Sequence, residues 1–281
     1  MKYGNLHLHS NQSDGGFRPA FLVRLAKSLG YGAIALTDHE TLTGIPELME
    51  AAKKDGMEAM SGVEFCTSVQ GKEIHITGLD FDYEHPSIVS FSRRICESIN
   101  ERARIKFEDM IERGDFEGIC WQDVINLAPK TDFICIDHIC HAFDHLGICS
   151  YNEQDKVRIS FNKCNPKKYY FKRPGVKETI RAIREAGGVA VLAHPEECCF
   201  DMEILEEIIP MGINGIEVSH PDLTERGEKL AIEAARKYRL YSSGGTDHTG
   251  VMSACGGENI RKALHGVTKD EYRAIKERRL E

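Results

Sequence analysis

The N-terminal stretch Tyr3-Gly4-Asn5-Leu6-His7-Leu8-His9-Ser10 has the pattern of a β-strand that carries two histidines. Because side chains alternate along a strand, His7 and His9 fall on the same face. A carboxylate, Asp14, follows five residues after His9 in a loop. Neutral imidazole together with carboxylate suits zinc, manganese or iron. The stretch indicates a metal site at a strand end, although solvent-exposed histidines are the alternative for this stretch alone.

The same residue types recur at the ends of later predicted strands. These strands are expected at residues 33–36, 57–63, 73–77, 189–193, 215–218 and 240–245. Any single polar residue of this kind is more often an ordinary core or surface group. Titratable residues placed by chance would, however, be scattered over helix faces as well. The candidate metal ligands are His7, His9, Asp14, His39, Glu64, His75, His194, Asp247 and His248.

Helical patterns alternate with these strands, which predicts an α/β fold with a parallel sheet or barrel. The active site of such a barrel lies at the carboxyl ends of its strands, where the candidate ligands fall. Residues 86–169 break the alternation and are polar and helical. We therefore expect a barrel domain formed by 1–85 and 170–281, with 86–169 as an inserted helical domain. A charged tail helix at 269–279 is expected to be exposed.

Composition excludes several classes of function. The 281 residues are 41% hydrophobic and 28% charged, which is typical of a globular protein with a full core. The net charge of -8 gives no electrostatic case for wrapping duplex nucleic acid. No apolar run approaches the ~20 residues of a membrane helix. The ten cysteines form no Cys-x-x-Cys pair and no signal peptide is visible, so we expect a cytoplasmic protein with free thiols.

Six short motifs resemble, in order, those of the PHP (polymerase and histidinol phosphatase) family. They are His7-Leu8-His9-Ser10, Ser13-Asp14-Gly15, Thr37-Asp38-His39, Gly62-Val63-Glu64, Ala193-His194-Pro195 and Gly245-Thr246-Asp247-His248. The resemblance implies a distorted (β/α)7 barrel with a two- or three-metal phosphoesterase site. One departure is that Asp247 and His248 are adjacent, whereas the family usually separates them by one residue.

The middle of the chain is similar to PHP phosphoesterases that act on adenosine monophosphate and 3′,5′-bisphosphorylated nucleotides. The similar elements are Trp121-Gln122-Asp123-Val124 and Asp137-His138-Ile139-Cys140. The insertion of those enzymes usually shows Arg-Pro-His-Ile-Ala-Arg, whereas residues 136–141 here lack both arginines. If those arginines hold phosphate, this chain must use other groups or another substrate.

The resemblance also implies a ligand set for each of two or three divalent ions of manganese, iron or zinc. The sets are His7, His9, Glu64 and Asp247; Asp14, His39 and His248; and Glu64, His75 and His194. A hydroxide that bridges two metals would attack phosphorus. Asp38 is expected to orient His39 as a neighbouring carboxylate rather than to bind metal.

For phosphate binding, we consider Arg173 in the basic run 163–173, Arg18 beside the Asp14 loop, and His138. A solvated linker and exposed helix surface are the competing interpretations of these residues. The leading hypothesis is a phosphoesterase acting on phosphomonoesters of small substrates, and the resemblance implies that these substrates are nucleotides. The alternatives are a 5′-3′ exonuclease on short oligonucleotides, a phosphatase of the histidinol-phosphate type and, last, a binding module without catalysis.

Overall fold

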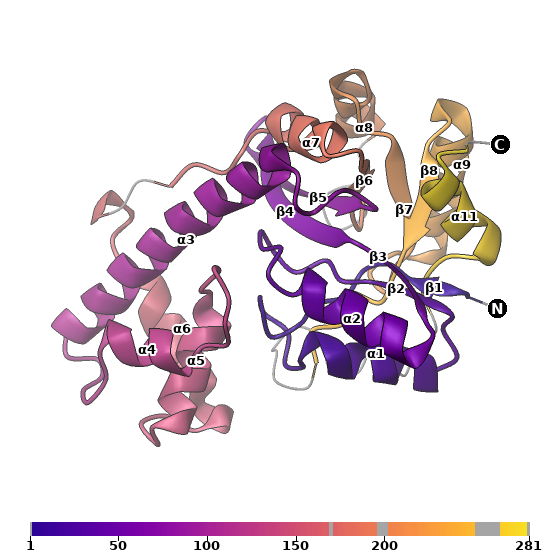
Figure 1. The fold of residues 1–281 in the computed structure, drawn as a ribbon. Helices are drawn as coiled ribbons and strands as arrows, with labels where there is room; N and C mark the ends of the chain where they lie inside the picture. The colour runs from indigo at the N-terminus through magenta and orange to yellow at the C-terminus, as the bar shows by residue number, and fades with distance from the viewer. Residues whose placement is uncertain (1, 169–170, 196–201, 251–264, 280–281) are drawn as a thin grey trace.

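The computed structural model describes residues 2–168, 171–195, 202–250 and 265–279 (Figure 1). Its strands lie in two sheets. Three parallel strands form the first sheet: β1 (Gly4–Asn5), β2 (Ala33–Ala35) and β3 (Glu58–Met60). Five strands follow one another in the second sheet: β4 (Gly62–Val69), β5 (Lys72–Leu79), β6 (Val189–Leu192), β7 (Gly215–Ser219) and β8 (Tyr241–Gly244).

Backbone hydrogen bonds join the two sheets along two seams. After β1, the chain runs beside the end of β8, where His9 N donates to His248 O at 2.9 Å. Beyond β2, Glu40 N donates to the carbonyl oxygen of Glu64 in β4 at 2.8 Å. Strands β3 and β4 are separated only by Ser61 and form one interrupted strand. This arrangement agrees with the predicted distorted seven-stranded barrel.

The helices that alternate with the strands cover the outside of the sheets (Figure 1). They are α1 (Pro19–Ser28), α2 (Ile45–Asp55), α7 (Val176–Glu185), α8 (Met202–Ile208) and α9 (Glu225–Tyr238). Both α1 and α2 have proline in the first turn, and α2 ends at Gly56 with a left-handed φ of 65°. The apolar faces of α1 and α2 pack on β2 through Leu22 and Leu48, which are buried.

Two predictions about the strands need correction. The strand expected at 57–63 does not end before Glu64, because β4 continues through this residue to Val69. Strand β5 is also not parallel to its neighbours: it runs antiparallel to both β4 and β6. A parallel strand needs a crossover helix, whereas β4 and β5 are joined by a tight turn at Gln70 and Gly71, both with positive φ.

The C-terminal helix α11 (Lys269–Glu277) is not the exposed tail that its charge suggests. Tyr272 and Ile275 are 2% and 0% exposed and pack among side chains at the amino ends of strands, such as Val189 and Tyr241. The helix begins with a capping box, in which Thr268 and Glu271 satisfy each other's backbone N–H groups. Two apolar residues one turn apart are therefore enough to cover this end of the barrel.

The helical segment consists of α3 (Pro86–Glu112), α4 (Trp121–Leu127), α5 (Ile136–His145), α6 (Gln154–Asn162) and the single turns η1 (Tyr151–Glu153) and η2 (Pro166–Lys168). The first half of α3 packs on the barrel through Phe91, whereas its second half joins a separate core through Phe107. The predicted boundary at 169/170 falls on residues outside the described part. The division into two domains stays a prediction.

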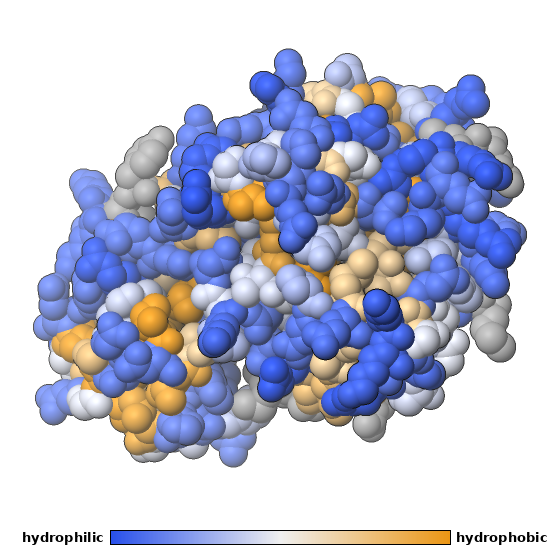
Figure 2. All heavy atoms as spheres, viewed as in Figure 1, coloured by the Kyte–Doolittle hydropathy of each residue, from blue (hydrophilic) through white to orange (hydrophobic). Residues whose placement is uncertain are grey.

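Apolar surface is concentrated on this helical segment, as Figure 2 shows over α4, α5 and α6. Of the six large apolar side chains that are exposed in the described residues, five lie there: Val89, Ile125, Leu146, Tyr151 and Ile159. The barrel face in the same view is largely polar.

We expect Gly245→Ala to destabilise the protein by about 2 kcal/mol or more, because a Cβ at this position would lie 2.3 Å from the backbone N of His7. The matched change Gly175→Ala places its Cβ in open space and should alter stability by less than ~0.5 kcal/mol. Urea unfolding measures both. Equal unfolding midpoints for the two variants would show that the seam between β1 and β8 is not tightly packed.

Candidate metal centre

The segment after β1 places His7 and His9 at the seam with β8, where both side chains are buried. Leu8 N donates to Thr37 Oγ1 at 3.1 Å, and Leu6 N donates to Gly244 O at 3.1 Å, so neighbours on both sides hold the segment. The chain then turns back at Gly15, where any Cβ would meet the carbonyl oxygen of His9 at 2.4 Å. The turn thereby keeps the Asp14 loop close to His9.

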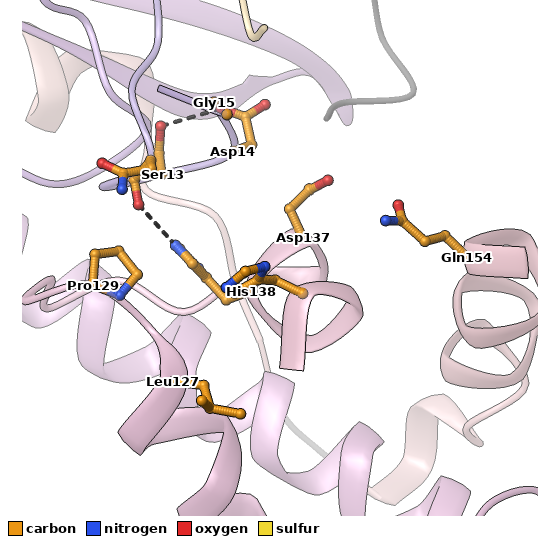
Figure 3. A pocket seen from close by; sticks show the side chains of 11 residues that line it. Ser13, Asp14, Gly15, Leu127, Pro129, Asp137, His138 and Gln154 are labelled. Atoms are coloured by element: carbon orange, nitrogen blue, oxygen red, sulfur yellow. Dashed lines mark hydrogen bonds between the residues drawn. The ribbon is translucent and has the colours of Figure 1, made fainter. Parts of the chain in front are cut away.

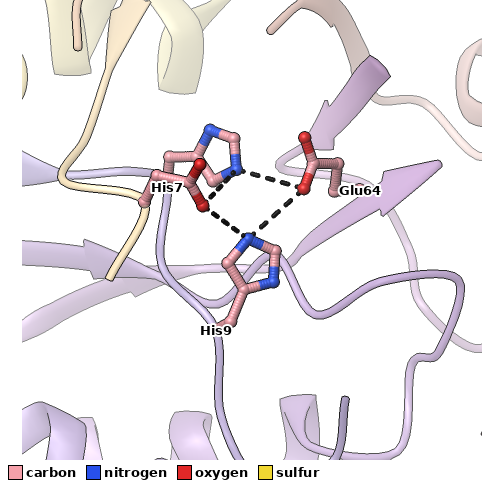
Figure 4. A group of neighbouring side chains, drawn as sticks. His7, His9 and Glu64 are labelled. Atoms are coloured by element: carbon pink, nitrogen blue, oxygen red, sulfur yellow. Dashed lines mark ion pairs between the residues drawn. The ribbon is translucent and has the colours of Figure 1, made fainter. Parts of the chain in front are cut away.

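Four side chains from three segments of the chain form the central cluster: His7, His9, Glu64 and Asp247. Figure 4 shows how His7, His9 and Glu64 of this cluster face one another. Nε2 of His7 and Nε2 of His9 each lie 3.3 Å from Glu64 Oε2. Their distances to Asp247 Oδ1 are 3.5 Å and 2.9 Å. Two imidazoles and two carboxylates therefore face a common point.

Two further groups adjoin the central cluster. His75 Nδ1 and His194 Nε2 lie 3.1 Å and 3.0 Å from the other oxygen of Glu64, Oε1. On the other side, His9 Nδ1 lies 3.5 Å from Asp14 Oδ1, and His39 Nε2 lies 3.8 Å from Asp14 Oδ2. The central cluster shares Glu64 with the first of these groups and His9 with the second.

The residues present fit a metal centre. Nε2 of His7 and both ring nitrogens of His9 are buried and make no hydrogen bond within the described residues, even though carboxylate oxygens lie close to them. Unpaired buried polar atoms of this kind are costly in a protein interior. Divalent cations would satisfy them, since imidazole nitrogen and carboxylate oxygen are the donors that zinc, manganese and iron accept.

The carboxylates and imidazoles of the cluster shift one another's pKa values. Burial alone would raise the pKa of Glu64, but the neighbouring imidazoles of His7, His39 and His75 hold it well below its usual range. Burial lowers the pKa of His7, yet the carboxylates of Glu217, Glu64 and Asp247 outweigh that effect and raise it to about 10. In the metal-free protein, protons on the imidazoles therefore balance the carboxylates.

His248 is buried beside the cluster, in the position where the sequence departs from the family motif. Its backbone oxygen accepts the hydrogen bond from His9 N, and its ring stacks on Phe17 with centroids 6.1 Å apart. Both ring nitrogens are buried and make no hydrogen bond in the described part of the chain. The predicted grouping of His248 with Asp14 and His39 stays a prediction.

Sequence reasoning missed two buried residues next to the cluster, Glu217 in β7 and His220 just after it. Glu217 Oε1 lies 2.8 Å from His7 Nδ1, which leaves His7 Nε2 to face the cluster. His220 Nδ1 accepts from Asp222 N at 3.2 Å, and its Nε2 lies 3.4 Å from Asp247 Oδ2. A signal was present, because His220 precedes a proline after a strand, as His194 does.

Asp38 is a supporting carboxylate, but its partner differs from the one expected. Its oxygens accept hydrogen bonds from Ser10 N at 2.6 Å, Ser10 Oγ at 2.7 Å and Ser13 Oγ at 2.7 Å. The ring of His39 instead faces the thiol of Cys66, with Nδ1 and Sγ 3.6 Å apart. Asp38 therefore anchors the loop that carries Asp14 rather than orienting His39.

Cys66 in β4 is a second group that sequence reasoning passed over. It lies with Glu73 and His75 in a further group of possible ligands. Burial raises the pKa of this thiol, but the imidazoles of His75 and His39 outweigh it and lower the pKa to about 5. The sequence held no signal for this role, because an isolated cysteine in a strand is usually a core residue.

The three residues considered for phosphate binding occupy different places. Arg18 is largely exposed and pairs with Glu47 at 3.5 Å. Arg173 pairs with Glu73 at 2.5 Å and lines a cavity next to His39. His138 is buried at the joint between barrel and helical segment.

Two cavities formed by described residues adjoin the centre. The Asp14 cavity, of about 280 Å³, lies between the Asp14 loop and helices α5 and α6, with Asp137, His138 and Gln154 on its far side (Figure 3). His138 Nε2 there lies 3.1 Å from Asn11 O. The His39 cavity, of about 340 Å³, lies on the other side between β4 and helices α3 and α6. A substrate can thus approach the centre from the helical segment.

The family model of the PHP domain matches residues 5–146, half of the chain. The chain belongs to the PHP domain family. A 5′-3′ exoribonuclease of Haemophilus influenzae is 29% identical over 249 residues, which cover 86% of this chain and 88% of the relative. A 3′,5′-nucleoside bisphosphate phosphatase of Chromobacterium violaceum is 28% identical over 249 residues, which cover 86% of this chain and 86% of the relative.

A phosphoribosyl 1,2-cyclic phosphate 1,2-diphosphodiesterase of Eggerthella lenta is 25% identical over 88% of this PHP chain and 94% of its own length. The fold also matches a solved structure from Bifidobacterium adolescentis, described as a metal-dependent phosphoesterase. That match has a TM-score of 0.79 at 24% identity and covers 100% of this chain and 97% of the other. This structural similarity shows that the two chains share a fold. In the described residues, no helix combines the length and apolar character needed to cross a membrane.

We expect the affinity for a divalent metal to rise between about pH 6 and pH 8. His7, with a pKa of about 10 in the metal-free protein, must lose its proton to bind metal. Each displaced proton makes the affinity change about tenfold per pH unit. Competition with a chromophoric chelator measures this slope, and His7→Gln should bind more weakly with a shallower slope.

The same shift sets the sign of a stability effect. The pKa of His7 in the folded, metal-free protein lies above its unfolded value of 6.5. Protonated His7 therefore stabilises the fold fully below pH 6.5, and this stabilisation is lost as the pH rises through about 10. Two outcomes of the metal-binding experiment would contradict a protonated cluster. One is a metal affinity that does not change between about pH 6 and pH 8, and the other is an equal pH dependence of the affinity in the native protein and in His7→Gln.

Proposed function

We propose that this PHP chain is a metal-dependent phosphoesterase that hydrolyses phosphomonoesters of small substrates, with nucleotides as the best-supported class. One observation carries the proposal: Glu64 presents Oε2 to His7 and His9 and Oε1 to His75 and His194. A carboxylate placed between two groups of imidazoles is the arrangement that holds two neighbouring cations. Such a pair clamps the attacking and leaving oxygens in phosphoryl transfer.

Two or three ions of manganese, iron or zinc are proposed as the cofactors. The first would be held by the central cluster, the second by Asp14 and His39 with His248, and the third by Glu64, His75 and His194. When bound, these ions lower the pKa of water toward ~7 and polarise the phosphate. Their supporting groups are Glu217, which orients His7, and Asp38, which anchors the Asp14 loop.

The proposed substrate class follows from the relatives and from the site. Two of the relatives named above act on phosphorylated nucleotides or sugars, as their names state. The two cavities beside the centre, of about 280 and 340 Å³, have the volume of small-molecule pockets. A binding module without catalysis is disfavoured because all nine expected positions keep ligating residue types. The cytoplasmic location stays a prediction.

We expect Asp14→Asn and His9→Ala each to lower kcat on p-nitrophenyl phosphate and nucleoside monophosphates by at least about 100-fold, since each removes a proposed ligand. Metal analysis should find at least about two ions per chain in the native protein and fewer in the variants. The control is Asp155→Asn, an exposed residue of α6, which should keep native rates and metal content. Near-native turnover by either ligand variant would overturn the assignment.

A second candidate function is 5′-3′ exonuclease activity on short oligonucleotides, which the 29% identity to the Haemophilus influenzae exoribonuclease favours. We expect it to show as the stepwise release of mononucleotides from a short 5′-phosphorylated oligoribonucleotide, resolved by chromatography, and to weaken as salt rises. Hydrolysis of mononucleotides without shortening of any oligonucleotide would remove this candidate.

A further inference from the structure

The hairpin of β4 and β5 brings a thiol, a carboxylate and an imidazole together beside the His39 cavity. Cys66 in β4 lies directly opposite His75 in β5, and Glu73 is two residues from His75, so the three side chains share one face of the hairpin. One sulfur, one carboxylate oxygen and one ring nitrogen of these residues lie within 4.8 Å of one another. Three ligating groups of different chemistry are thus held at one place.

This group faces away from the metal centre. Nδ1 of His75 lies 3.1 Å from Glu64 Oε1, whereas its Nε2 lies 3.3 Å from Glu73 Oε1. The two nitrogens of an imidazole are separate ligand atoms. Glu73 belongs to none of the ligand sets proposed for the centre, and both Glu73 and Cys66 line the His39 cavity. The group is therefore next to the centre rather than a part of it.

Glu40 offers a further ligand atom on the wall of the same cavity. Its side chain is 1% exposed, and its Oε1 accepts a hydrogen bond from Cys66 N at 2.9 Å. Its Oε2 is buried and makes no hydrogen bond within the described residues. A buried carboxylate oxygen without a partner is costly, and a cation held by the neighbouring thiol would satisfy it.

The charge next to the thiol also favours a cation. Arg173 Nη2 pairs with Glu73 Oε2 at 2.5 Å, which leaves Oε1 of the same carboxylate to face His75. A cysteine that binds metal does so as a thiolate. The carboxylate of Glu73 and the thiolate of Cys66 together outweigh the single guanidinium group that is paired with them.

The other basic side chains of this cavity come from the helical segment. Arg158 Nη2 lies 2.5 Å from Asp137 Oδ1, and Arg102 and Lys106 of α3 each lie over an aromatic ring, at 4.2 and 4.1 Å from its centroid. These groups belong to the walls formed by helices, whereas the thiol and the carboxylates belong to the wall formed by the barrel. The cavity therefore has a basic side and an acidic side.

We propose that Cys66, Glu73 and His75 form an accessory site for a thiophilic divalent cation such as zinc, distinct from the ions proposed for the centre. Thiolate is a soft ligand that zinc binds well, whereas manganese prefers oxygen. Sulfur, imidazole nitrogen and carboxylate oxygen are all zinc ligands, and Glu40 Oε2 or water would complete a tetrahedral set. The inference concerns metal binding alone and does not depend on hydrolysis.

Cobalt(II) is the probe for this site, because a thiolate bound to cobalt gives a strong charge-transfer band in the near ultraviolet, whereas imidazole and carboxylate ligands do not. The full chain is stripped of metal with a chelator and titrated with cobalt. We expect the native protein to develop the band and Cys66→Ser to abolish it. Cys66→Ser should also bind about one zinc ion fewer per chain and keep its manganese affinity within about twofold. The control is Cys120→Ser, an exposed cysteine, which should keep the band.

Two further variants test whether the thiol acts together with Glu73. Glu73→Gln removes a ligand oxygen and should weaken cobalt binding, followed at the band, at least about tenfold. The matched variant Arg173→Met breaks the ion pair to the same carboxylate but keeps its oxygens, so the affinity should be unchanged or higher. An unchanged affinity in Glu73→Gln would assign the thiol to an ion of the centre and overturn the separate site. Equal weakening in both variants would overturn the role of Glu73 as a ligand.

The spectrum of the native protein decides the remaining outcomes. The absence of the band at saturating cobalt, or its persistence in Cys66→Ser, overturns the accessory site. If the band behaves as expected but no phosphate ester is hydrolysed with any metal, the phosphoesterase proposal fails and the accessory site stands. Hydrolysis by a protein that shows no band gives the opposite result.

Discussion

The site depends on one buried carboxylate, Glu64, whose two oxygens face ring nitrogens that come from five positions of the chain. The side chain is 1% exposed, so water does not stabilise its charge. Desolvation of an ion in a protein interior costs several kcal/mol unless opposite charges surround it. Here they do: the surrounding imidazoles are those of His7, His9, His39, His75 and His194. Protons or metal ions must supply the positive charge, and this requirement ties the strand ends together.

The reversed strand β5 is what brings His75 to this carboxylate. In a parallel sheet, only the carboxyl ends of strands reach the rim where the ligands gather, as His39 and His194 do. Strand β5 runs the other way, so a residue in its first half pairs with the β4 segment beyond Glu64; His75 lies opposite Cys66. The turn between the strands has positive φ at Gln70 and at Gly71, as a two-residue hairpin turn requires. A short turn thus replaces a crossover helix.

The sequence was sufficient to predict the convergence of the ligand types, because strand-end motifs are local patterns. It was not sufficient for Glu217, which lies within an apolar strand and looks like one polar interruption of a core segment. The burial of α11 was missed for a related reason: a strongly charged helix can still be anchored by two apolar residues, Tyr272 and Ile275. The face of α3 that carries Arg102 and Lys106 could not be assigned either. Helical periodicity defines the faces of a helix, but only tertiary packing decides which one meets the cavity.

The helical segment and the barrel jointly determine the position of Asp14. Side chains of Thr131, Cys135 and His138 contact backbone carbonyls of residues 11–13, with Thr131 Oγ1 at 2.7 Å, Cys135 Sγ at 3.4 Å and His138 Nε2 at 3.1 Å. Three side chains from one short segment therefore hold the loop from outside, while the barrel holds it through buried carboxylate contacts from inside. A change in the helical segment would move a proposed metal ligand as well as the cavity walls. The position of a proposed metal ligand therefore depends on contacts from a different part of the sequence than the strands that carry the other candidate ligands.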